Sequence, residues 1–302
     1  MLRILLLTKK HIFTCCLPLL FACQLIAQNR YAELQLIDIK QLKENYGSRF
    51  DLSGIVKVSD KTYVVADKPY NNYIYEIKLN DNDWSIENTI EIGLLDQVDI
   101  EAIDHCNGNF YFTNEHGNII YEMNANQKIR IVKPYYKGKN IDIEHWKKNT
   151  GLESLAIDCE NSIIYAAKER QARFIYTVDL KYNNIISKFN IPETESSDFA
   201  DMKYENGYIY LLERNGNYIT KVDVKTEQVI AKVSYKNTCS SPEGKLYEPS
   251  KYGMAEALLL TENEIWLGLD NNGLTVSENA AKKHSMKGSQ PAILRFVRPV
   301  GF

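Results

Sequence analysis

Carboxylates recur along this chain at a regular interval. In five stretches a small or acidic residue adjoins an aliphatic one, and a lone carboxylate follows 13 to 16 residues later. Acids gathered in this way are suited to a hard cation such as Ca²⁺, which takes six to eight oxygen ligands. The stretches are Leu52-Ser53-Gly54-Ile55 to Asp67, Ile100-Glu101-Ala102-Ile103 to Glu115, Leu152-Glu153-Ser154-Leu155 to Glu169, Phe199-Ala200-Asp201-Met202 to Glu213, and Ala255-Glu256-Ala257-Leu258 to Asp270.

The elements that position these acids follow from the repeat length. Successive stretches begin 47 to 56 residues apart, which is the length of a four-stranded propeller blade. We therefore predict an all-β fold, a five-bladed β-propeller, with six blades as the alternative. The second repeat illustrates the expected order of strands, namely Ile100 to Cys106, Phe110 to Asn114, Ile119 to Met123 and Ile129 to Tyr135.

The two ends of the chain indicate how the ring closes. After Ile293 to Val297 the chain stops without a fourth strand for the last repeat, whereas Ala32 to Ile39 is a spare strand before the first. We expect the last blade to borrow that strand, because an open sheet edge invites aggregation. Three segments that break the period are candidate loops over an axial site: 138–150, 237–252 and 274–290.

In a propeller the first strand of each blade lies nearest the axis, and the second strand returns beside it. Acids at the starts of first strands and at the ends of second strands should therefore meet at one mouth of the channel. The predicted metal ligands are Glu101, Glu153 and Glu256. The predicted outer acidic ring is Asp67, Glu115, Glu169, Glu213 and Asp270.

So many like charges need compensation. Two carboxylates about 5 Å apart repel by about 3 kcal/mol at an effective dielectric constant near 20, so the acids require a cation, basic partners or raised pKa values. Four basic residues adjoin outer acids and could either neutralise them or clamp an anion: Lys68, Lys168, Arg170 and Arg214. The alternative is that the acids only pair with these residues or line a wet channel.

The N-terminus has the pattern of an export signal. Basic residues precede an apolar run from His11 to Ala27 that is short for a membrane span. Residues 1–27 are predicted to be a signal peptide, with a lipoprotein signal to Cys23 as the competing interpretation, and 28–302 a single propeller domain. The protein is then exported, as a periplasmic, outer-membrane lipoprotein or secreted protein, with no transmembrane span in its mature form and as a monomer.

Charge and cysteine content exclude some classes of partner. Three of the 36 basic and none of the 39 acidic side chains lie in residues 1–27, so the remainder has a net charge of −6, which disfavours nucleic acid as a partner. Cysteines 106, 159 and 239 remain after cleavage. An odd number argues against a disulfide framework, and we expect Cys106 and Cys159 to be buried small apolar residues.

The repeat phrases resemble a known group of exported bacterial propellers. Asp99-Ile100-Glu101-Ala102-Ile103 and Gly151-Leu152-Glu153-Ser154-Leu155-Ala156 are similar to the SdiA-regulated family, and Ala255-Glu256-Ala257-Leu258 with Asp270-Asn271-Asn272-Gly273 is similar to the related esterase-like phytase domain. The resemblance implies a propeller with calcium in its central channel and, in the second family, phosphoester activity. This chain has Ala102, Ser154 and Ala257 where those families usually have glycine.

Two functions remain open on these grounds. The first is an exported calcium-binding propeller with a binding or scaffold role, whose partner is a small anionic ligand or another envelope protein. The second is a calcium-dependent phosphoesterase or esterase, or a lactonase-type hydrolase. The chain has no Gly-x-Ser-x-Gly, phosphate-loop or His-Glu-x-x-His motif, so catalytic residues are unknown and enzymatic activity is left uncertain.

Overall fold

The computed structural model describes residues 31–44, 49–66, 72–93, 98–115, 119–132, 135–136, 151–170, 174–194, 196, 198–239, 245–249 and 254–302. Several predicted features lie outside these ranges. They are the signal segment 1–27 with Cys23, the acid Asp67 with its neighbour Lys68, and the loop 138–150.

Four antiparallel strands form the recurring unit of the fold, and in the first four units along the chain they are consecutive and pair in chain order. The fifth unit instead takes its outermost strand from the N-terminal segment. The first unit is β3 (Leu52–Val58), β4 (Lys61–Ala66), β5 (Tyr73–Leu79) and β6 (Asp83–Glu91). The second is β7 (Ile100–Cys106), β8 (Asn109–Asn114), β9 (Ile119–Met123) and β10 (Ile129–Val132). The third is β12 (Leu152–Asp158), β13 (Ile163–Lys168), β14 (Phe174–Asp179) and β15 (Asn184–Asn190). The fourth is β16 (Asp201–Glu205), β17 (Tyr208–Glu213), β18 (Tyr218–Asp223) and β19 (Gln228–Ser234). The fifth is β21 (Ala255–Leu260), β22 (Glu264–Leu269), β24 (Ala292–Val297) and β2 (Leu36–Leu42).

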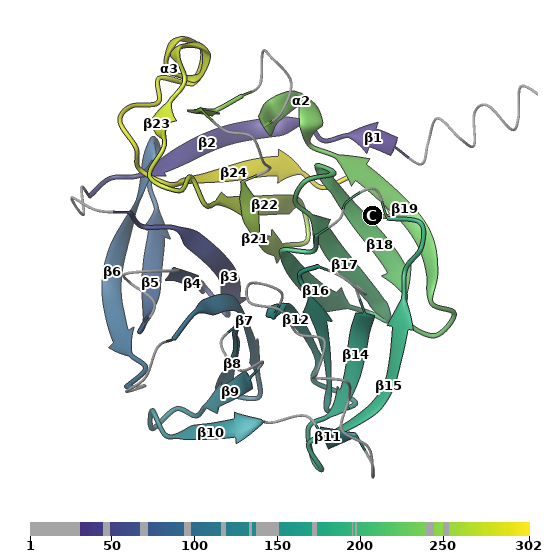
Figure 1. Cartoon of the computed structure of the whole chain (residues 1–302). Helices are drawn as coiled ribbons and strands as arrows, with labels where there is room; N and C mark the ends of the chain where they lie inside the picture. The colour runs from purple at the N-terminus through teal and green to yellow at the C-terminus, as the bar shows by residue number, and fades with distance from the viewer. Residues whose placement is uncertain are drawn as a thin grey trace, which may run out of the picture.

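The first strands of these units surround a common centre (Figure 1). β3 contacts β7, β7 contacts β12, β12 contacts β16, β16 contacts β21, and β21 contacts β3 again. The hydrophobic clusters lie between neighbouring units. Ile103 and Phe112 of the second unit, for example, belong to one buried cluster with Val65 and Ile74 of the first.

The N-terminal segment completes the fifth unit, but not with the predicted bounds. The expected strand Ala32 to Ile39 is divided into β1 (Tyr31–Glu33) and β2. β1 pairs in parallel with β19 of the fourth unit. β2 pairs antiparallel with β24, and its last two residues also pair in parallel with β6 of the first unit. The segment therefore joins the outer strands of three units.

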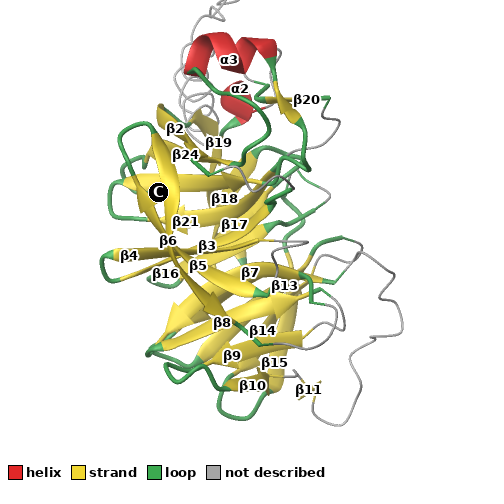
Figure 2. Ribbon diagram, turned by 90° about the vertical axis from the view of Figure 1, so that its left-hand side faces the viewer, coloured by secondary structure: helices red, strands yellow, loops and turns green. Residues whose placement is uncertain are grey.

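Shorter elements lie outside the main units. β11 (Tyr135–Tyr136) extends the third unit by pairing with β15. The predicted loop 237–252 overlaps α2 (Lys236–Cys239) and β20 (Tyr247–Glu248), and 274–290 contains β23 (Thr275–Val276) and α3 (Glu278–His284). Figures 1 and 2 place α3 on the outer side of the fifth unit, beside β2 and away from the inner strands. In the described part of the chain, neither helix is long and apolar enough to cross a membrane.

The expectation for two of the cysteines was wrong. Cys106, at the end of β7, and Cys159, directly after β12, form a disulfide with their Cα atoms 5.6 Å apart. The odd count of cysteines argued against this pairing. The tertiary structure brings the far ends of two neighbouring inner strands together, and the Cα separation is ordinary for a disulfide.

Candidate functional site

The predicted inner acids lie where the first strand of a unit loses its regular pairing with the second. In β7 the register shifts between Ile100 and Ala102, the residues on either side of Glu101. The same shift brackets Glu153 in β12 and Glu256 in β21. An extra residue of this kind bends the strand and re-aims its side chain, which is why β-bulges recur beside functional sites.

The other two units differ at this position. The first unit has the same register shift but carries Ser53 there. In the fourth unit the paired strand begins only at Asp201, opposite Leu212, so no register shift is present within β16. Ala200, which occupies the equivalent place in the repeat, precedes the strand. Only the second, third and fifth units therefore present a glutamate from a bulge.

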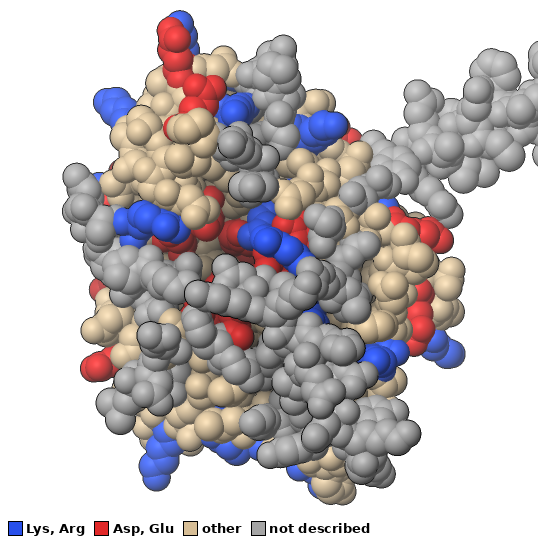
Figure 3. Space-filling view, viewed as in Figure 1, with Lys and Arg blue, Asp and Glu red and all other residues tan. Residues whose placement is uncertain are grey.

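Acids from the ends of the second strands meet two of these glutamates. Glu115, Glu153 and Glu169 each offer a carboxylate oxygen, and the three oxygens lie within 4.8 Å of one another. Asp99, Glu101 and Glu115 form a second group by the same measure, so Glu115 belongs to both. Figure 3 shows acidic and basic side chains close together near the middle of the face that is also turned to the viewer in Figure 1.

Glu153 is the least compensated of these acids. The residue is 6% exposed, and among the described residues its carboxylate has neither a hydrogen-bond donor nor an ion-pair partner. Burial raises the pKa of Glu153 well above its ordinary value, the charges of Glu169 and Glu256 raise it further, and Arg214 opposes them. A carboxylate in this environment requires a proton or a cation. We refer to the following acids as the acidic mouth: Asp99, Glu101, Glu115, Glu153, Glu169 and Glu256.

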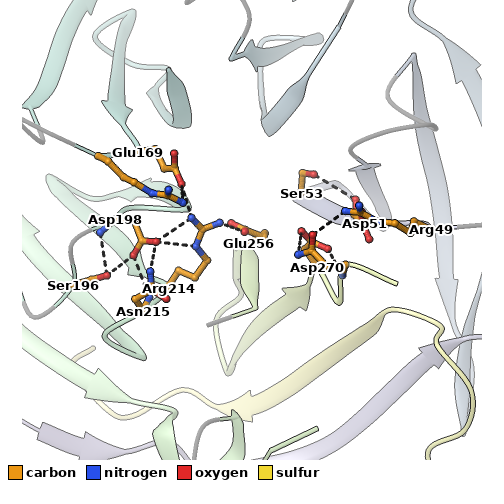
Figure 4. A network of polar contacts seen from close by, with 12 residues as sticks. Arg49, Asp51, Ser53, Glu169, Ser196, Asp198, Arg214, Asn215, Glu256 and Asp270 are labelled. Carbon is orange, nitrogen blue, oxygen red and sulfur yellow. Dashed lines mark hydrogen bonds and ion pairs between the residues drawn. The ribbon is translucent and has the colours of Figure 1, made fainter. Parts of the chain in front are cut away.

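Arg214 is a buried cation within this group (Figure 4). Its Nε and Nη2 donate to Oδ2 of Asp198 at 3.0 and 2.9 Å, and Nη2 also donates to Oε1 of Glu169 at 2.6 Å. Nη1 contacts Glu256. Burial disfavours the charged guanidinium, yet Glu256 and Asp198 together raise the pKa of Arg214 above its ordinary value.

This arrangement corrects the predicted pairing of Arg214 with the acid beside it in sequence. Glu213 is fully buried inside the fourth unit, where it accepts a hydrogen bond from the Ser196 amide at 2.7 Å and contacts the Thr220 hydroxyl. Glu213 is the last residue of β17 and Arg214 lies in the turn that follows, and the two side chains reach different partners. Glu213 is thus not brought to the acidic mouth.

The remaining predicted residues lie as follows. Arg170 contacts its neighbour Glu169 and is 48% exposed. Lys168 is buried at the end of β13, and burial lowers its pKa. Asp270 faces Asp51 of the first unit; burial, followed by the charges of Asp51 and Glu256, raises the pKa of Asp270 well above its ordinary value.

The sequence analysis missed three buried acids, namely Asp99 in the acidic mouth and Asp51 and Asp198 outside it. Asp51, Asp99 and Asp198 immediately precede the first strands or their equivalents, and each is buried. Arg49 contacts Asp51. Their signal was available, because each stands two residues before the position of the inner acid in its repeat: Asp51-Leu52-Ser53, Asp99-Ile100-Glu101 and Asp198-Phe199-Ala200.

A second buried network crosses the centre further along the inner strands. Lys203 of β16 donates to the Ile103 carbonyl of β7 at 3.0 Å and pairs with Asp201 at 3.2 Å. Asp201 also accepts the Leu258 amide of β21 at 2.7 Å, and Asp104 of β7 accepts an amide of β12 at 3.0 Å. Burial raises the pKa of Asp201 to about 7, although Lys203 lowers it.

The donor set of the mouth suits a hard cation. The two groups of potential ligands contain carboxylates only, with no cysteine or histidine among the described members. Oxygen donors in irregular geometry favour Ca²⁺ over Zn²⁺. Glu153 adds an argument beyond the types of ligand atom. Its carboxylate is buried among other acids, and a bound cation would compensate its charge. His116, beside Glu115 in sequence, lies outside the described residues.

Comparison with known families gives one match that covers most of the chain. Residues 48–273 match the family described as Phytase-like, "Esterase-like activity of phytase". The expected resemblance to the esterase-like phytase domain is thereby confirmed. None of the curated proteins compared with the chain matches it in sequence.

Solved structures resemble the chain in fold. The glutaminyl cyclase of Myxococcus xanthus aligns with a TM-score of 0.58 at 9% identity, over 89% of this chain and 99% of that one. A luciferin-regenerating enzyme aligns with a TM-score of 0.48 at 10% identity, over 83% and 78%. At 9% identity the likeness to the glutaminyl cyclase concerns the fold alone, and it identifies a β-propeller.

Proposed function

This chain belongs to the Phytase-like family, and on that premise we propose that it is an exported β-propeller that binds calcium at the acidic mouth and serves a binding role there. One observation carries the proposal. Glu153 is buried among three further carboxylates, and within the described residues no donor reaches it. A divalent cation would remove the repulsion that otherwise forces a proton onto this group.

The ligands proposed for the cation are Glu115, Glu153 and Glu169, with Glu101 and Asp99 next to them. Glu256, predicted as a ligand from the repeat, is instead assigned to Arg214, which it contacts. Glu169 can both pair with arginine and bind the cation. Arg170 and Arg214 contact its Oε1, and a carboxylate has a second oxygen that can bind a metal ion. When bound, the cation would neutralise the acids and present a Lewis acid to a ligand oxygen.

A calorimetric titration with CaCl₂ tests the proposal. Wild-type mature protein should bind calcium, and its melting temperature should rise with calcium concentration. Glu153→Gln keeps the shape but removes a charged ligand, so its affinity should fall by at least about tenfold, equivalent to about 1.4 kcal/mol. Glu213→Gln is the matched control, because Glu213 belongs to the same sequence signature but contacts Ser196 and Thr220. Absence of calcium binding in the wild type would exclude the proposal, as would equal affinities for the two variants.

A second candidate function is hydrolysis of a phosphoester. It is favoured by Arg170, whose side chain is 48% exposed and contacts the proposed ligand Glu169, since a guanidinium fork matches phosphate oxygens. Arg214 is less suited, because its guanidinium already contacts Asp198, Glu169 and Glu256.

Turnover measurements separate the two candidates. A panel of phosphoesters and carboxylesters is assayed with calcium and with a chelator. Calcium-dependent turnover that Arg170→Gln abolishes, while calcium affinity and melting temperature are retained, would establish the hydrolase. A wild type that is inactive on the whole panel and binds calcium would leave the binding role.

We further infer that the propeller has five blades and that the protein is exported. The closed cycle of contacts between β3, β7, β12, β16 and β21 supports one blade for each four-stranded unit. The disulfide between Cys106 and Cys159 supports an oxidising compartment, because such bonds are rare in the reducing cytosol. Fractionation of the native host and mass spectrometry of the mature N-terminus would test export and the competing lipid attachment at Cys23.

A further inference from the structure

Arg214 is held by carboxylates from three different units. Asp198 precedes β16 in the fourth unit, Glu169 follows β13 in the third, and Glu256 lies in the register shift of β21 in the fifth. The Arg214 side chain is 12% exposed, and Nε, Nη1 and Nη2 all engage these acids. Figure 4 shows the guanidinium at the centre of the three carboxylates.

The grouping resembles that of the candidate calcium ligands. Glu115, Glu153 and Glu169 likewise come from more than one unit, here the second and the third. Each offers a carboxylate oxygen, and these oxygens lie within 4.8 Å of one another. Glu169 is a member of both groups, so the two groups adjoin. A guanidinium therefore lies among carboxylates of the same kind and origin as those proposed to hold a metal ion.

The fourth unit explains why an arginine is found there. This unit has no register shift in its first strand, and Ala200 stands where the second, third and fifth units carry a glutamate. Its second-strand acid, Glu213, turns into its own unit. The fourth unit thus contributes Arg214 to the mouth from the turn after β17.

We propose that the Arg214 guanidinium occupies a second cation position in the acidic mouth, formed by Asp198, Glu169 and Glu256, and so limits the number of divalent ions that the mouth binds. Three carboxylates around a buried centre repel one another, and the repulsion is stronger there than in water because the local dielectric constant is lower. The fixed charge of arginine removes this repulsion without a metal. Replacing it with a neutral side chain leaves an all-oxygen group that suits a hard cation.

The inference rests on the proposed function only for the first ion. Beyond that ion, it predicts that Arg214→Gln binds one more calcium ion per protein molecule than the wild type does. If the wild type binds none, the proposed function fails, while the difference between the two proteins still decides this inference.

Equilibrium dialysis against CaCl₂, with calcium and protein quantified separately, gives the stoichiometry. Arg214→Gln should bind one equivalent more than the wild type. Arg295→Gln is the matched control, because Arg295 also bridges two acids, Asp38 at 3.1 Å and Glu264 at 2.7 Å, at the outer side of the fifth unit. It should bind the same number of ions as the wild type. The double variant Arg214→Gln/Glu256→Gln should also return to the wild-type number, because one of the three carboxylates is gone.

Folding is monitored by circular dichroism in the same samples. An Arg214→Gln protein that is unfolded in chelator but folds in millimolar calcium, with the extra equivalent bound, supports the proposal. A variant that stays unfolded in calcium assigns Arg214 a purely structural role and overturns it. A folded Arg214→Gln with the wild-type stoichiometry overturns it too, as does an extra ion bound by Arg295→Gln.

Discussion

Burial dominates the chemistry of single residues in the centre of this molecule. Glu153, Glu256 and Asp201 are all at most 7% exposed, and burial is the largest cause of the raised pKa of each. Their environments differ in compensation. Glu256 forms an ion pair with Arg214, and Asp201 forms one with Lys203. The cation proposed to compensate Glu153 would instead be a metal ion from solution.

Asp201 provides a pH test that is separate from the acidic mouth. Its pKa is raised from 3.8 to about 7 in the folded protein, so the folded state holds a proton that the unfolded state releases. The stabilisation is complete below pH 3.8 and is lost as the pH rises through 7. Relative to Asp201→Asn, the wild type should lose about 3 kcal/mol of unfolding free energy between pH 5 and 8.

Urea unfolding of both proteins at several pH values in that range, with chelator present, measures this difference. Asp201→Asn removes the titrating group, while its amide oxygen can still accept a hydrogen bond from the Leu258 amide. A difference between the two free energies that does not change with pH would contradict the assignment.

At the scale of the element, each register shift in a first strand is followed by a small residue. The residue after each shift is Gly54, Ala102, Ser154 or Ala257. A Cβ on Gly54 would lie 2.9 Å from the Ile103 amide nitrogen. Gly54 therefore lets the neighbouring inner strands β3 and β7 approach each other.

Gly54→Ala should destabilise the protein, because the added methyl group would meet the backbone of β7 as well as Val65, whose Cγ2 would be 2.9 Å away. We expect a loss of about 1–3 kcal/mol, the usual cost of overpacking, measured by urea unfolding. Gly207→Asn is the control, because a Cβ there meets nothing within 4 Å and asparagine tolerates the left-handed conformation. Equal losses in both variants would refute the close-approach argument.

The N-terminal segment is the second element with a distinct role. Removal of residues through Leu42 exposes the edge of β24 and breaks the pairing with β6, so the melting temperature should fall by roughly 10 °C or more and the protein should aggregate. Removal through Gln35 deletes the pairing of β1 with β19, the buried Leu34 side chain and the hydrogen bond from the Val297 amide to the Gln35 carbonyl, but it keeps β2. This truncation should therefore cost less. Thermal unfolding and size-exclusion chromatography compare the two truncations. A protein lacking β2 that melts like the wild type would contradict this closure.

At the scale of the whole molecule, the ring is held by inner contacts, outer strands and one covalent bond. The disulfide joins the second and third units and spans 53 residues of sequence. Glu101 lies near the start of β7 and Cys106 at its end, so the disulfide and the acidic mouth occupy opposite ends of the same strand. The disulfide should therefore stabilise the ring with little effect on cation binding.

The double variant Cys106→Ala/Cys159→Ala should lose about 4 kcal/mol of unfolding free energy, the chain-entropy value for a loop of this length. Reductant should lower the stability of the wild type by a similar amount and leave the variant unchanged. Chemical unfolding with and without reductant measures both effects. Equal sensitivity to reductant in the two proteins would show that the bond does not stabilise the fold.

Local patterns determined the strands, their order and the positions of the acids. The Asn107-Gly108 turn, for example, has positive φ at both residues, as a two-residue hairpin requires. The repeat was sufficient to place Glu101, Glu115, Glu153 and Glu169 near one another, because strand pairing is fixed by alternation and turn length. The resemblance to the esterase-like phytase domain was identified from the same repeat motifs.

Only the tertiary structure decided how the charges are shared. Arg214 was expected either to neutralise Glu213 or to clamp an anion, yet it crosses between units to Asp198, Glu169 and Glu256. The disulfide and the divided N-terminal strand were likewise decided by which strands become neighbours when the ring closes. Arg214 lies in the turn after β17, beyond the strand that carries Glu213, and residues far apart in the chain meet around the axis. Ion pairing at such a centre therefore depends on contacts that local sequence does not encode.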